Sequence, residues 1–475
     1  MEPRQHREHS LLAVTVPQPA ALDPGFQPAV LAARAYREAL ARHAGRATLL
    51  IALERTQGTK SVFELELFPE GSPHDGDTLI YAERTIKFLL WSRGGWRLSL
   101  AGPPSLCRKL AALYQPGGAR DFDVKLMTRA FGRPFEVPIV APEQIPREAE
   151  APLASGGQLQ GCRLGFDLGA SDYKVAAVHD GEVVFSGEFP WDPVRQNDPD
   201  YHLGHLNEGL KNAASHLPRV DAIGGSAAGI YVDNRIMMAS LFRSVPAEVF
   251  EARVKPLFLN LQKEWGVPLV VVNDGEVTAL AGALSLHLKP LLGIAMGSSE
   301  AAGFLDRRGR ITGWLNELAF APVDFNPKAP RDEWSGDRGV GALYFSQQAV
   351  NKLAPAAGFS FPEEMGLPER LVAVQSQADR GVERAEAIFR TIGLYLGYSI
   401  AHYADHYDFS DLLLLGRVTS GRGGELILEQ ARQVLASEFS ELAQAVTIHV
   451  PDEKSRRVGQ AVAAASLPAF DGGGN

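Results

Sequence analysis

Two short Gly/Ser stretches follow apolar runs in the two halves of the sequence. Asp167-Leu-Gly169-Ala-Ser171 ends one run, and Gly297-Ser298-Ser299 ends the run that begins at Gly293. A second apolar segment follows each stretch, so each predicts a strand, a turn and a strand. Glycine N–H groups and serine hydroxyls in such turns can donate hydrogen bonds to phosphate oxygens. One loop alone indicates only a tight turn, but the repeated spacing indicates an internal duplication with two facing phosphate loops.

Asp167 lies at the end of an apolar strand pattern. A carboxylate there is costly unless it is paired, hydrated or close to a metal ion. A contact to Mg²⁺ through water would account for its position. The alternative is that Asp167 accepts hydrogen bonds from the N–H groups of its own turn.

Asn273-Asp274 lies between an apolar strand at 268–272 and a helical pattern at 276–287. Either residue could simply be the N-cap of that helix. Open α/β sheets also bind their ligands at the carboxyl ends of strands. A carboxylate at that position could accept the proton of an attacking hydroxyl, which is what phosphoryl transfer requires.

The elements that must position these residues follow a regular order. The first half predicts β-β-β-α-β-α-β, with strands at 164–168, 174–179, 182–189, 220–225 and 268–272 and helices at 201–217 and 246–265. The second half restarts at Gly293 and continues with helices at 369–378 and 382–407, a strand at 412–415, a glycine-rich loop at 416–424 and a helix at 425–435. The fold class is therefore α/β.

The first 150 residues predict a separate α+β domain, with a helix at 30–43 and strands at 46–53 and 62–68. Its role is not legible from the sequence, and it could itself be the enzyme. The aromatic run from Tyr81 to Trp91 could line a site or pack in a core. A segment rich in Pro, Gly and acidic residues at 138–157 predicts a linker.

Bulk composition excludes several classes of protein. The net charge of -9 gives no polybasic surface for nucleic acid or anionic lipid, and no stretch reaches the roughly 20 apolar residues that span a bilayer. We therefore expect a cytoplasmic protein without nucleic-acid or membrane partners. The two cysteines, Cys107 and Cys162, exclude a disulfide framework and are expected to be buried.

Residues 165–467 resemble the ROK (repressor, ORF, kinase) family of actin-like ATPases. The similar motifs are Asp167–Ser171 with Lys174, Val272–Leu280, Gly297–Ser299, Asn316–Phe320 and Leu415–Gly421. The resemblance implies a duplicated, ribonuclease H-like fold behind the N-terminal domain at 1–150. Its lobes would span 160–273 and 274–475, with a C-terminal helix that could return to the first lobe.

The resemblance also implies an ATP-dependent, Mg²⁺-requiring carbohydrate kinase with Asp274 as the catalytic base. The nucleotide and its phosphates would be bound by Asp167, Gly169, Ser171, Lys174, Gly297, Ser298, Ser299, Gly416, Arg417 and Gly421. The sugar-like substrate would be bound by Asn273, Glu317, Ser240 and Gly225. A homodimer is implied by the resemblance alone.

Several positions depart from the family pattern. Phe320 replaces a histidine, Ser335–Gly341 replaces a zinc-binding cysteine cluster, and Ala342 stands near an expected second sugar-binding glutamate. No zinc site is expected, and the sugar site must differ from that of the family. Glu300 directly follows the second phosphate loop, where an anion would repel phosphate. Two functions therefore stay open: a kinase for a sugar or polyol, and a non-catalytic regulatory protein that binds a nucleotide or sugar.

Overall fold

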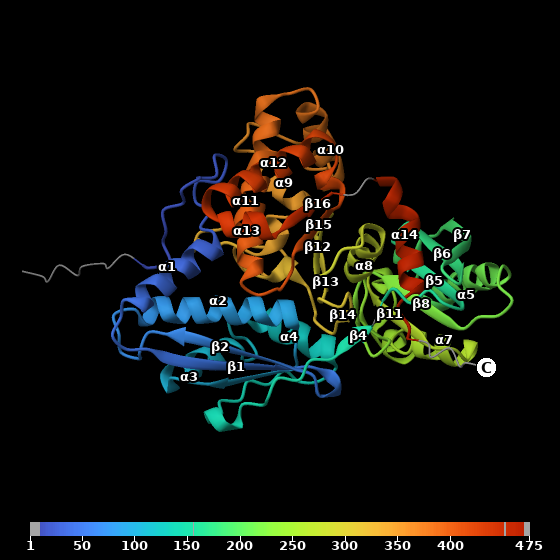
Figure 1. Ribbon diagram of the computed structural model, residues 1–475, viewed down its shortest axis with the longest axis horizontal. Coiled ribbons are helices and arrows are strands. Elements are labelled where there is room, and N and C mark those ends of the chain that lie inside the picture. Colours follow the sequence, from blue (N-terminus) through green and yellow to red (C-terminus); the bar gives the residue numbers. More distant parts are fainter. Residues whose placement is uncertain (1–9, 155, 451–452, 470–475) are drawn as a thin grey trace, which may run out of the picture.

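The structure is a computed structural model that describes residues 10–154, 156–450 and 453–469. The outermost parts of the predicted N-terminal domain and second lobe, residues 1–9 and 470–475, lie outside this range. Two lobes and an N-terminal region (residues 10–150) lie against one another (Figure 1). Within the described residues, no helix is both long and apolar enough to span a bilayer.

Lobe I is built on a five-stranded sheet with the order β11-β8-β5-β6-β7. Its strands are β5 (Cys162–Leu168), β6 (Asp172–His179), β7 (Glu182–Pro190), β8 (Ala222–Ala227) and β11 (Leu269–Asn273). The first three form an antiparallel meander, and β8 and β11 add in parallel. A short hairpin of β9 (Ile230–Val232) and β10 (Arg235–Met238) follows β8.

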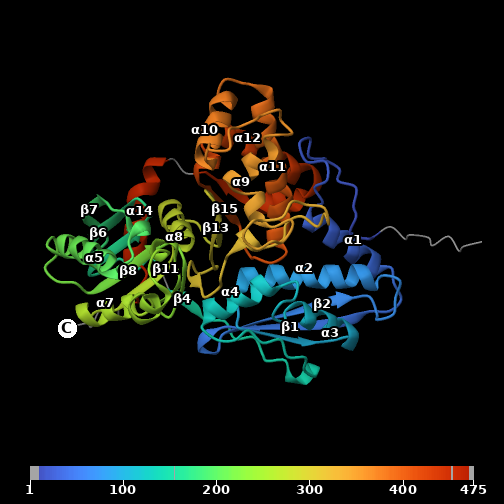
Figure 2. The same cartoon turned by 180° about the vertical axis from the view of Figure 1, so that it is seen from behind.

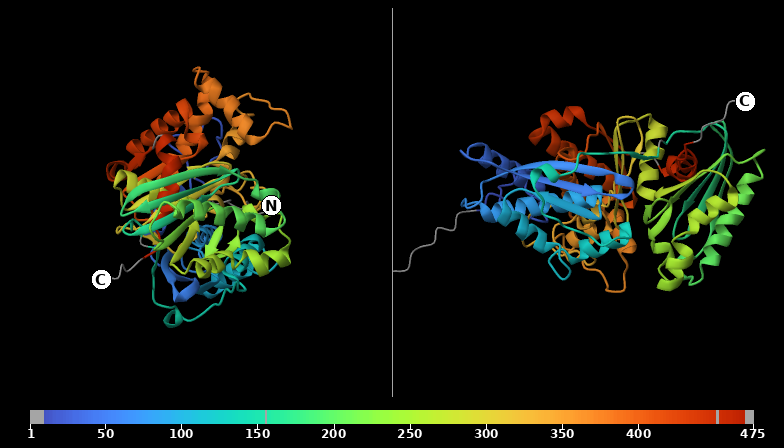
Figure 3. Two further views of the ribbon diagram at one scale, coloured as in Figure 1. Left: turned by 90° about the vertical axis from the view of Figure 1, so that its right-hand side faces the viewer. Right: turned by 90° about the horizontal axis from the view of Figure 1, so that it is seen from below.

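Helices cover both faces of this sheet, α5 (Pro199–Ala214) on one and α14 (Glu453–Ala465) on the other (Figure 3). Two strand glycines allow α14 to approach the sheet closely. A β-carbon at Gly165 would lie 1.8 Å from the carbonyl oxygen of Ala461, and one at Gly224 would lie 1.6 Å from that of Ala464. The last helix of the chain therefore packs on the first lobe.

Lobe II repeats the same sheet. Its order is β16-β15-β12-β13-β14-β4, with strands β12 (Leu291–Met296), β13 (Glu300–Leu305), β14 (Ile311–Thr312), β15 (Asp411–Leu415), β16 (Thr447–His449) and β4 (Pro152–Ala154). The β12–β13–β14 meander is antiparallel, and β15 and β16 add in parallel, as β8 and β11 do. Strand order and direction thus confirm the internal duplication.

The helices of lobe II frame this sheet. They are α8 (Asp274–Leu286), α9 (Gln347–Leu353), α10 (Leu367–Ala378), α11 (Glu383–Ala404), α12 (Gly421–Glu438) and α13 (Ser440–Ala445). Most of them lie within a few residues of the predicted helices.

In lobe I, the predicted single helix at 246–265 is wrong in extent: it divides into α6 (Ala247–Val249), a π-helical turn (Phe250–Val254) and α7 (Leu257–Trp265). Pro256, which lacks an N–H donor, separates the last two pieces.

The N-terminal region has a three-stranded antiparallel sheet, ordered β2-β1-β3, and four helices. Its elements are α1 (Ala29–Ala41), β1 (Ala47–Glu54), β2 (Lys60–Leu67), α2 (Asp75–Arg93), β3 (Arg97–Ala101), α3 (Pro104–Leu113) and α4 (Asp121–Phe131). Figure 2 shows α2 running beneath lobe II.

This region and lobe II share one hydrophobic core. Buried Tyr36, Phe88 and Trp91 belong to the same apolar cluster as Phe389 and Tyr395 of α11. The aromatic run on α2 is therefore core. The predicted linker is also structured in part, because Leu98 and Leu100 of β3 donate to the carbonyl oxygens of Glu136 and Pro138, and β4 pairs with β14. Cys107 and Cys162 are buried, as expected.

Candidate active site between the lobes

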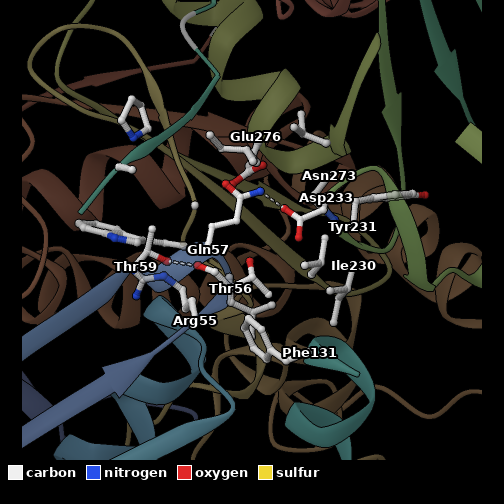
Figure 4. Close-up of a pocket in the computed structure, with 18 of the residues that line it drawn as sticks. Arg55, Thr56, Gln57, Thr59, Phe131, Ile230, Tyr231, Asp233, Asn273 and Glu276 are labelled. Carbon is white, nitrogen blue, oxygen red and sulfur yellow. Dashed lines mark hydrogen bonds between the residues drawn. The ribbon is translucent and has the colours of Figure 1, made fainter. Parts of the chain in front are cut away.

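A cavity of about 110 Å³ lies where lobe I, lobe II and the N-terminal region meet. Lobe I contributes the β9–β10 hairpin with Tyr231 and Asp233, and the β11–α8 junction adds Asn273 and Glu276. Figure 4 shows Glu276 and Asn273 on one side of the cavity, with Arg55, Thr56 and Phe131 of the N-terminal region on the other. Lobe II completes the lining with Gly313, Trp314, Leu315 and Glu317.

Asn273 and Asp274 form the junction between β11 and α8. The Asn273 side chain caps the helix by accepting a hydrogen bond from the Gly275 N–H at 2.7 Å, and its Nδ2 donates to the carbonyl oxygen of Gly229 at 2.7 Å. The capping alternative is therefore confirmed for Asn273. Asp274 is the first helical residue, and burial, reinforced by the charge of Asp167, raises its pKa to about 6.

Asp167 lies at the end of β5, 6% exposed, within electrostatic range of Asp274. It accepts a hydrogen bond from Ser226 Oγ of the neighbouring strand β8 at 2.6 Å. Burial raises the pKa of Asp167, and the Ser226 bond and Lys174 act in the opposite direction. The hydrogen bond to Asp167 thus comes from the adjacent strand and not from the N–H groups of its own turn at Gly169–Ser171.

The predicted phosphate loops are tight turns at the ends of equivalent strands. Gly169 N–H bonds to the carbonyl oxygen of Asp172 at 3.0 Å, and Gly297 N–H bonds to that of Ser299 at 3.0 Å. The side chains of Ser171, Ser298 and Ser299 are exposed. Lys174 on β6 forms an ion pair with Asp172. These turns can offer hydroxyl groups and a cation to a phosphate.

The glycine-rich loop after β15 lies against the second of these turns. Gly416 has a φ of 98°, and a β-carbon there would lie 2.3 Å from the carbonyl oxygen of Met296, the residue before Gly297. Only glycine permits this approach. Arg417 and Gly421 are exposed on the same loop, so the predicted nucleotide-binding residues Gly416, Arg417 and Gly421 lie next to a predicted phosphate loop.

Glu317 is held by the N-terminal region. The N–H groups of Leu315, Asn316 and Glu317 donate to the carbonyl oxygens of Arg93, Ser92 and Trp91 at 3.2, 3.0 and 3.0 Å, respectively. The last carbonyl groups of a helix have no partner within the helix, and this segment satisfies three of them at the end of α2. Burial, with a further contribution from Asp274, raises the pKa of Glu317 to about 7.

Glu276, to which the sequence assigned no role, is a second carboxyl group at the cavity. It is 5% exposed on the first turn of α8, and Asn316 Nδ2 donates to its Oε1 at 3.5 Å. Burial raises its pKa to about 8, and nearby Glu317 acts in the same direction. Its position in the sequence, two residues after Asp274, could have indicated that it lies near the site.

Comparisons with known proteins agree on the fold. No protein-family model matches the sequence, and no curated protein matches it. A solved ROK family transcriptional regulator, described as a homolog of the E. coli MLC protein, is similar with a TM-score of 0.51 and 19% identity, over 65% of this chain and 78% of that chain. The ROK hexokinase from Thermus thermophilus is similar with a TM-score of 0.50 and 18% identity, over 64% and 97% of the two chains. The chain has the ROK fold.

The departures from the ROK sequence pattern coincide with the docking of the N-terminal region. Phe320 packs against Trp91 and Phe122, with ring centroids 4.6 and 5.3 Å apart. Asp337, in the segment that replaces the ROK cysteine cluster, forms ion pairs with Arg84, Lys87 and Arg120 at 3.0, 3.1 and 2.8 Å. Both positions thus face the N-terminal region.

Glu300 does not behave as the sequence suggested. Its side chain is 3% exposed and lies against Gly341, and Tyr403 OH donates to its Oε1 at 3.3 Å. Burial raises its pKa to about 8, so this carboxyl group is protonated at neutral pH. Because the Glu300 side chain is neutral and points into the core, it would not repel a phosphate bound at the second phosphate loop of this ROK fold.

Two predicted substrate residues lie away from the cavity. Ser240 is exposed in the 3₁₀ turn Ser240–Phe242 and does not line it. Gly225 is inside β8, where a β-carbon would lie 2.2 Å from the Phe166 ring, so it serves strand packing in lobe I. Asn273 and Glu317 do line the cavity. The lining residues that sequence reasoning missed include Arg55, Thr56, Gln57, Thr59 and Phe131 of the N-terminal region, for which the ROK pattern offers no template, and the β9–β10 hairpin of lobe I.

Proposed function

We propose that this chain belongs to the ROK family and transfers a phosphoryl group from ATP to a hydroxyl of a sugar or related polyol. The proposal depends chiefly on the position and pKa of Asp274. This residue follows β11 directly, between Asn273 and Glu276, which both line the cavity, although Asp274 itself does not. Its pKa of about 6 is close to neutral pH, where a general base is most effective.

Asp274 would accept the proton of the attacking hydroxyl as the new O–P bond forms. The bond between that phosphorus and the bridging oxygen of ADP would break in line with it. Glu317, Glu276 and Asn273 supply acceptors and donors for the remaining hydroxyl groups, while Phe131 and Tyr231 contribute aromatic surface. This mixture of polar groups and an aromatic face suits a polyhydroxylated ring.

The residues present also fit Mg²⁺. Among the described residues there is no group of three or more His, Cys, Asp or Glu that could enclose a metal ion. Mg²⁺ in phosphoryl-transfer sites is usually held by only one or two carboxylates, with water and substrate phosphates. Asp167, close to Asp274 and to the turn at Gly169, would hold it through water. When bound, Mg²⁺ would neutralise charge on the phosphates.

The test measures Mg-ATP binding and ADP release across a panel of sugars for the full chain and for Asp274→Asn. The variant should bind sugar and nucleotide but lose about 10²- to 10⁴-fold in turnover, the usual contribution of a general base. Asp180→Asn is the matched control, because Asp180 is exposed, has a φ of 50°, and accepts the Gly161 N–H through Oδ1, an oxygen that asparagine keeps. Its other oxygen lies 3.6 Å from the exposed His179 ring, a surface contact of little energy. It should turn over like the natural chain.

Failure of nucleotide to bind at millimolar concentration would exclude the kinase. Binding of ATP and sugar with no turnover, unchanged by Asp274→Asn, would instead support the non-catalytic regulatory protein. A DNA-binding regulator is not favoured, because the described N-terminal region is a three-stranded sheet with helices that share the core of lobe II.

A further inference from the structure

The connection between β1 and β2 brings the N-terminal region into the candidate ligand cavity. It contains the turn Thr56–Gly58, in which Gln57 has the left-handed values φ 55° and ψ 23°. Gln57 Nε2 donates to Asp233 Oδ1 of the β9–β10 hairpin at 2.5 Å. Figure 4 shows the Gln57 side chain extending from this turn toward Asp233 and Glu276. A non-glycine residue in this conformation is uncommon, and strained residues of this kind cluster at ligand clamps and active sites.

The turn is anchored within the N-terminal region, which is in turn bound to lobe II. Arg55 is 4% exposed, and its guanidinium donates to Ser61 Oγ at 2.7 Å and Glu150 Oε2 at 2.6 Å. Asp23 accepts from Lys352 and Tyr395 of lobe II at 3.2 and 2.6 Å. Together with the shared core and the Asp337 ion pairs, these contacts make the N-terminal region a fixed wall of lobe II.

The contact with lobe I is much smaller. Ala130 of α4 packs with Ile230 and Met237 of the β9–β10 hairpin in a separate small apolar cluster, and Gln57 makes the polar contact with Asp233. Buried area largely determines how strongly two surfaces hold together. A movement between the lobes would therefore part this contact first and free the Gln57 amide from Asp233.

The cavity itself limits the ligand. Its volume of about 110 Å³ is below the roughly 300 Å³ of common ligand pockets, so the cavity suits a small ligand. Asn273 and Glu276 lie on one side, and Thr56 and Phe131 close the opposite side (Figure 4). A ring held by Asn273 and Glu276 would meet the Gln57 side chain, which extends from the turn Thr56–Gly58 toward Glu276, where a second ring would continue (Figure 4).

We infer that Gln57 is a specificity-determining residue of this site: on ligand binding its amide exchanges Asp233 for a hydroxyl of the ligand, and its side chain, projecting from the turn Thr56–Gly58, restricts the ligand to a single sugar ring. The inference rests on the proposed sugar-like ligand but not on phosphoryl transfer. It assigns the N-terminal region a direct part in substrate selection.

The test is titration calorimetry of the full chain, without nucleotide, with D-glucose, D-mannose and N-acetyl-D-glucosamine and with their 4-linked disaccharides. Gln57→Gly removes the side chain and suits the positive φ, so the fold should be retained. His287→Gly is the control, because His287 also has a positive φ of 56°, is exposed, and does not line the cavity. Unfolding midpoints of both variants check that the fold is intact.

The natural chain and His287→Gly should bind at least one monosaccharide and reject its disaccharide. Gln57→Gly should bind that monosaccharide about tenfold more weakly, the equivalent of one hydrogen bond, and should accept the disaccharide. Asp233→Ala breaks the same hydrogen bond from the other side. If Gln57 only latches the lobes, both variants will change binding equally; if Gln57 contacts the ligand, only Gln57→Gly will accept the disaccharide.

Disaccharide binding by the natural chain, or unchanged selectivity in Gln57→Gly, would overturn the inference even if the chain proves to be a kinase. The expected binding pattern without phosphoryl transfer would overturn the kinase alone. No binding of any sugar by either form would remove the cavity as a sugar site and the inference with it.

Discussion

The backbone N–H of Glu317 donates to the carbonyl oxygen of Trp91 at 3.0 Å. A residue of lobe II that lines the cavity is thereby positioned by the last turn of α2 in the N-terminal region. The contact joins positions 226 residues apart. The Trp91 carbonyl group, which has no partner within its own helix, thereby fixes the backbone of a residue that lines the site. Changes in the N-terminal region should therefore affect both stability and ligand binding.

The ion pairs of Asp337 give the first stability prediction. Asp337→Asn would leave Arg84, Lys87 and Arg120, all largely buried, without one shared carboxylate. Removing one partner from a buried ion pair costs about 3–5 kcal/mol, so the free energy of unfolding in urea should fall by that amount. Burial by itself raises the pKa of Asp337, but the three cations hold it below its ordinary value.

An exposed ion pair is the control for Asp337. Arg307 and Asp408 are 76% and 59% exposed in their side chains. Asp408→Asn should therefore cost less than about 1 kcal/mol. Equal losses for the two variants would show that the Asp337 network does not stabilise the junction.

The buried carboxyl groups predict how stability depends on pH. Glu276 and Glu300 have pKa values raised to about 8, so the folded chain keeps protons that the unfolded chain releases above about pH 4.5. Stability should be fully present below that pH, fall by about 1.4 kcal/mol per pH unit for each group as the pH rises, and level off above about pH 8. Urea unfolding at pH 5, 7 and 9 measures this.

Glu300→Gln replaces a protonated carboxyl group with a neutral group of the same shape. The free energy of unfolding should then fall less between pH 5 and pH 9, because the contribution of Glu300 to that fall is removed. Glu441→Gln, at an exposed position on α13, should leave the slope unchanged. A slope in Glu300→Gln equal to that of the natural chain would contradict the placement of Glu300 as a neutral core residue.

Gly416→Ala tests the close approach of the glycine-rich loop at 416–424 to β12. The new β-carbon would meet the carbonyl oxygen of Met296 at 2.3 Å and would also be strained at a φ of 98°. Displacing this loop next to Gly297 should weaken Mg-ATP binding by at least about tenfold, or 1.4 kcal/mol, in a titration.

Gly181→Ala separates strain from collision. Gly181 has a φ of 90° but open space around it, so alanine there should cost only the conformational penalty of about 1–2 kcal/mol. Its ATP affinity should match that of the natural chain. If both alanine variants bind ATP normally, the loop at Gly416 does not contribute to a nucleotide site.

The sequence by itself determined the α/β class, the duplicated order of strands and the position of Asp167 and Asp274 at strand ends. These features depend on local patterns: apolar runs of strand length, turn residues and a cap, each readable within about ten residues. The internal repeat supported the same strand order a second time, because both halves of the sequence show it.

Only the tertiary structure decided which residues share the cavity. Gln57, Glu276 and Glu317 meet there although they come from the N-terminal region, the start of α8 and the segment after β14. Likewise, the sequence placed Glu300 beside phosphate, and the fold directs it toward Tyr403 and Gly341. Such contacts join residues far apart in the sequence, and no local periodicity records which distant partner will neutralise, bury or position a side chain.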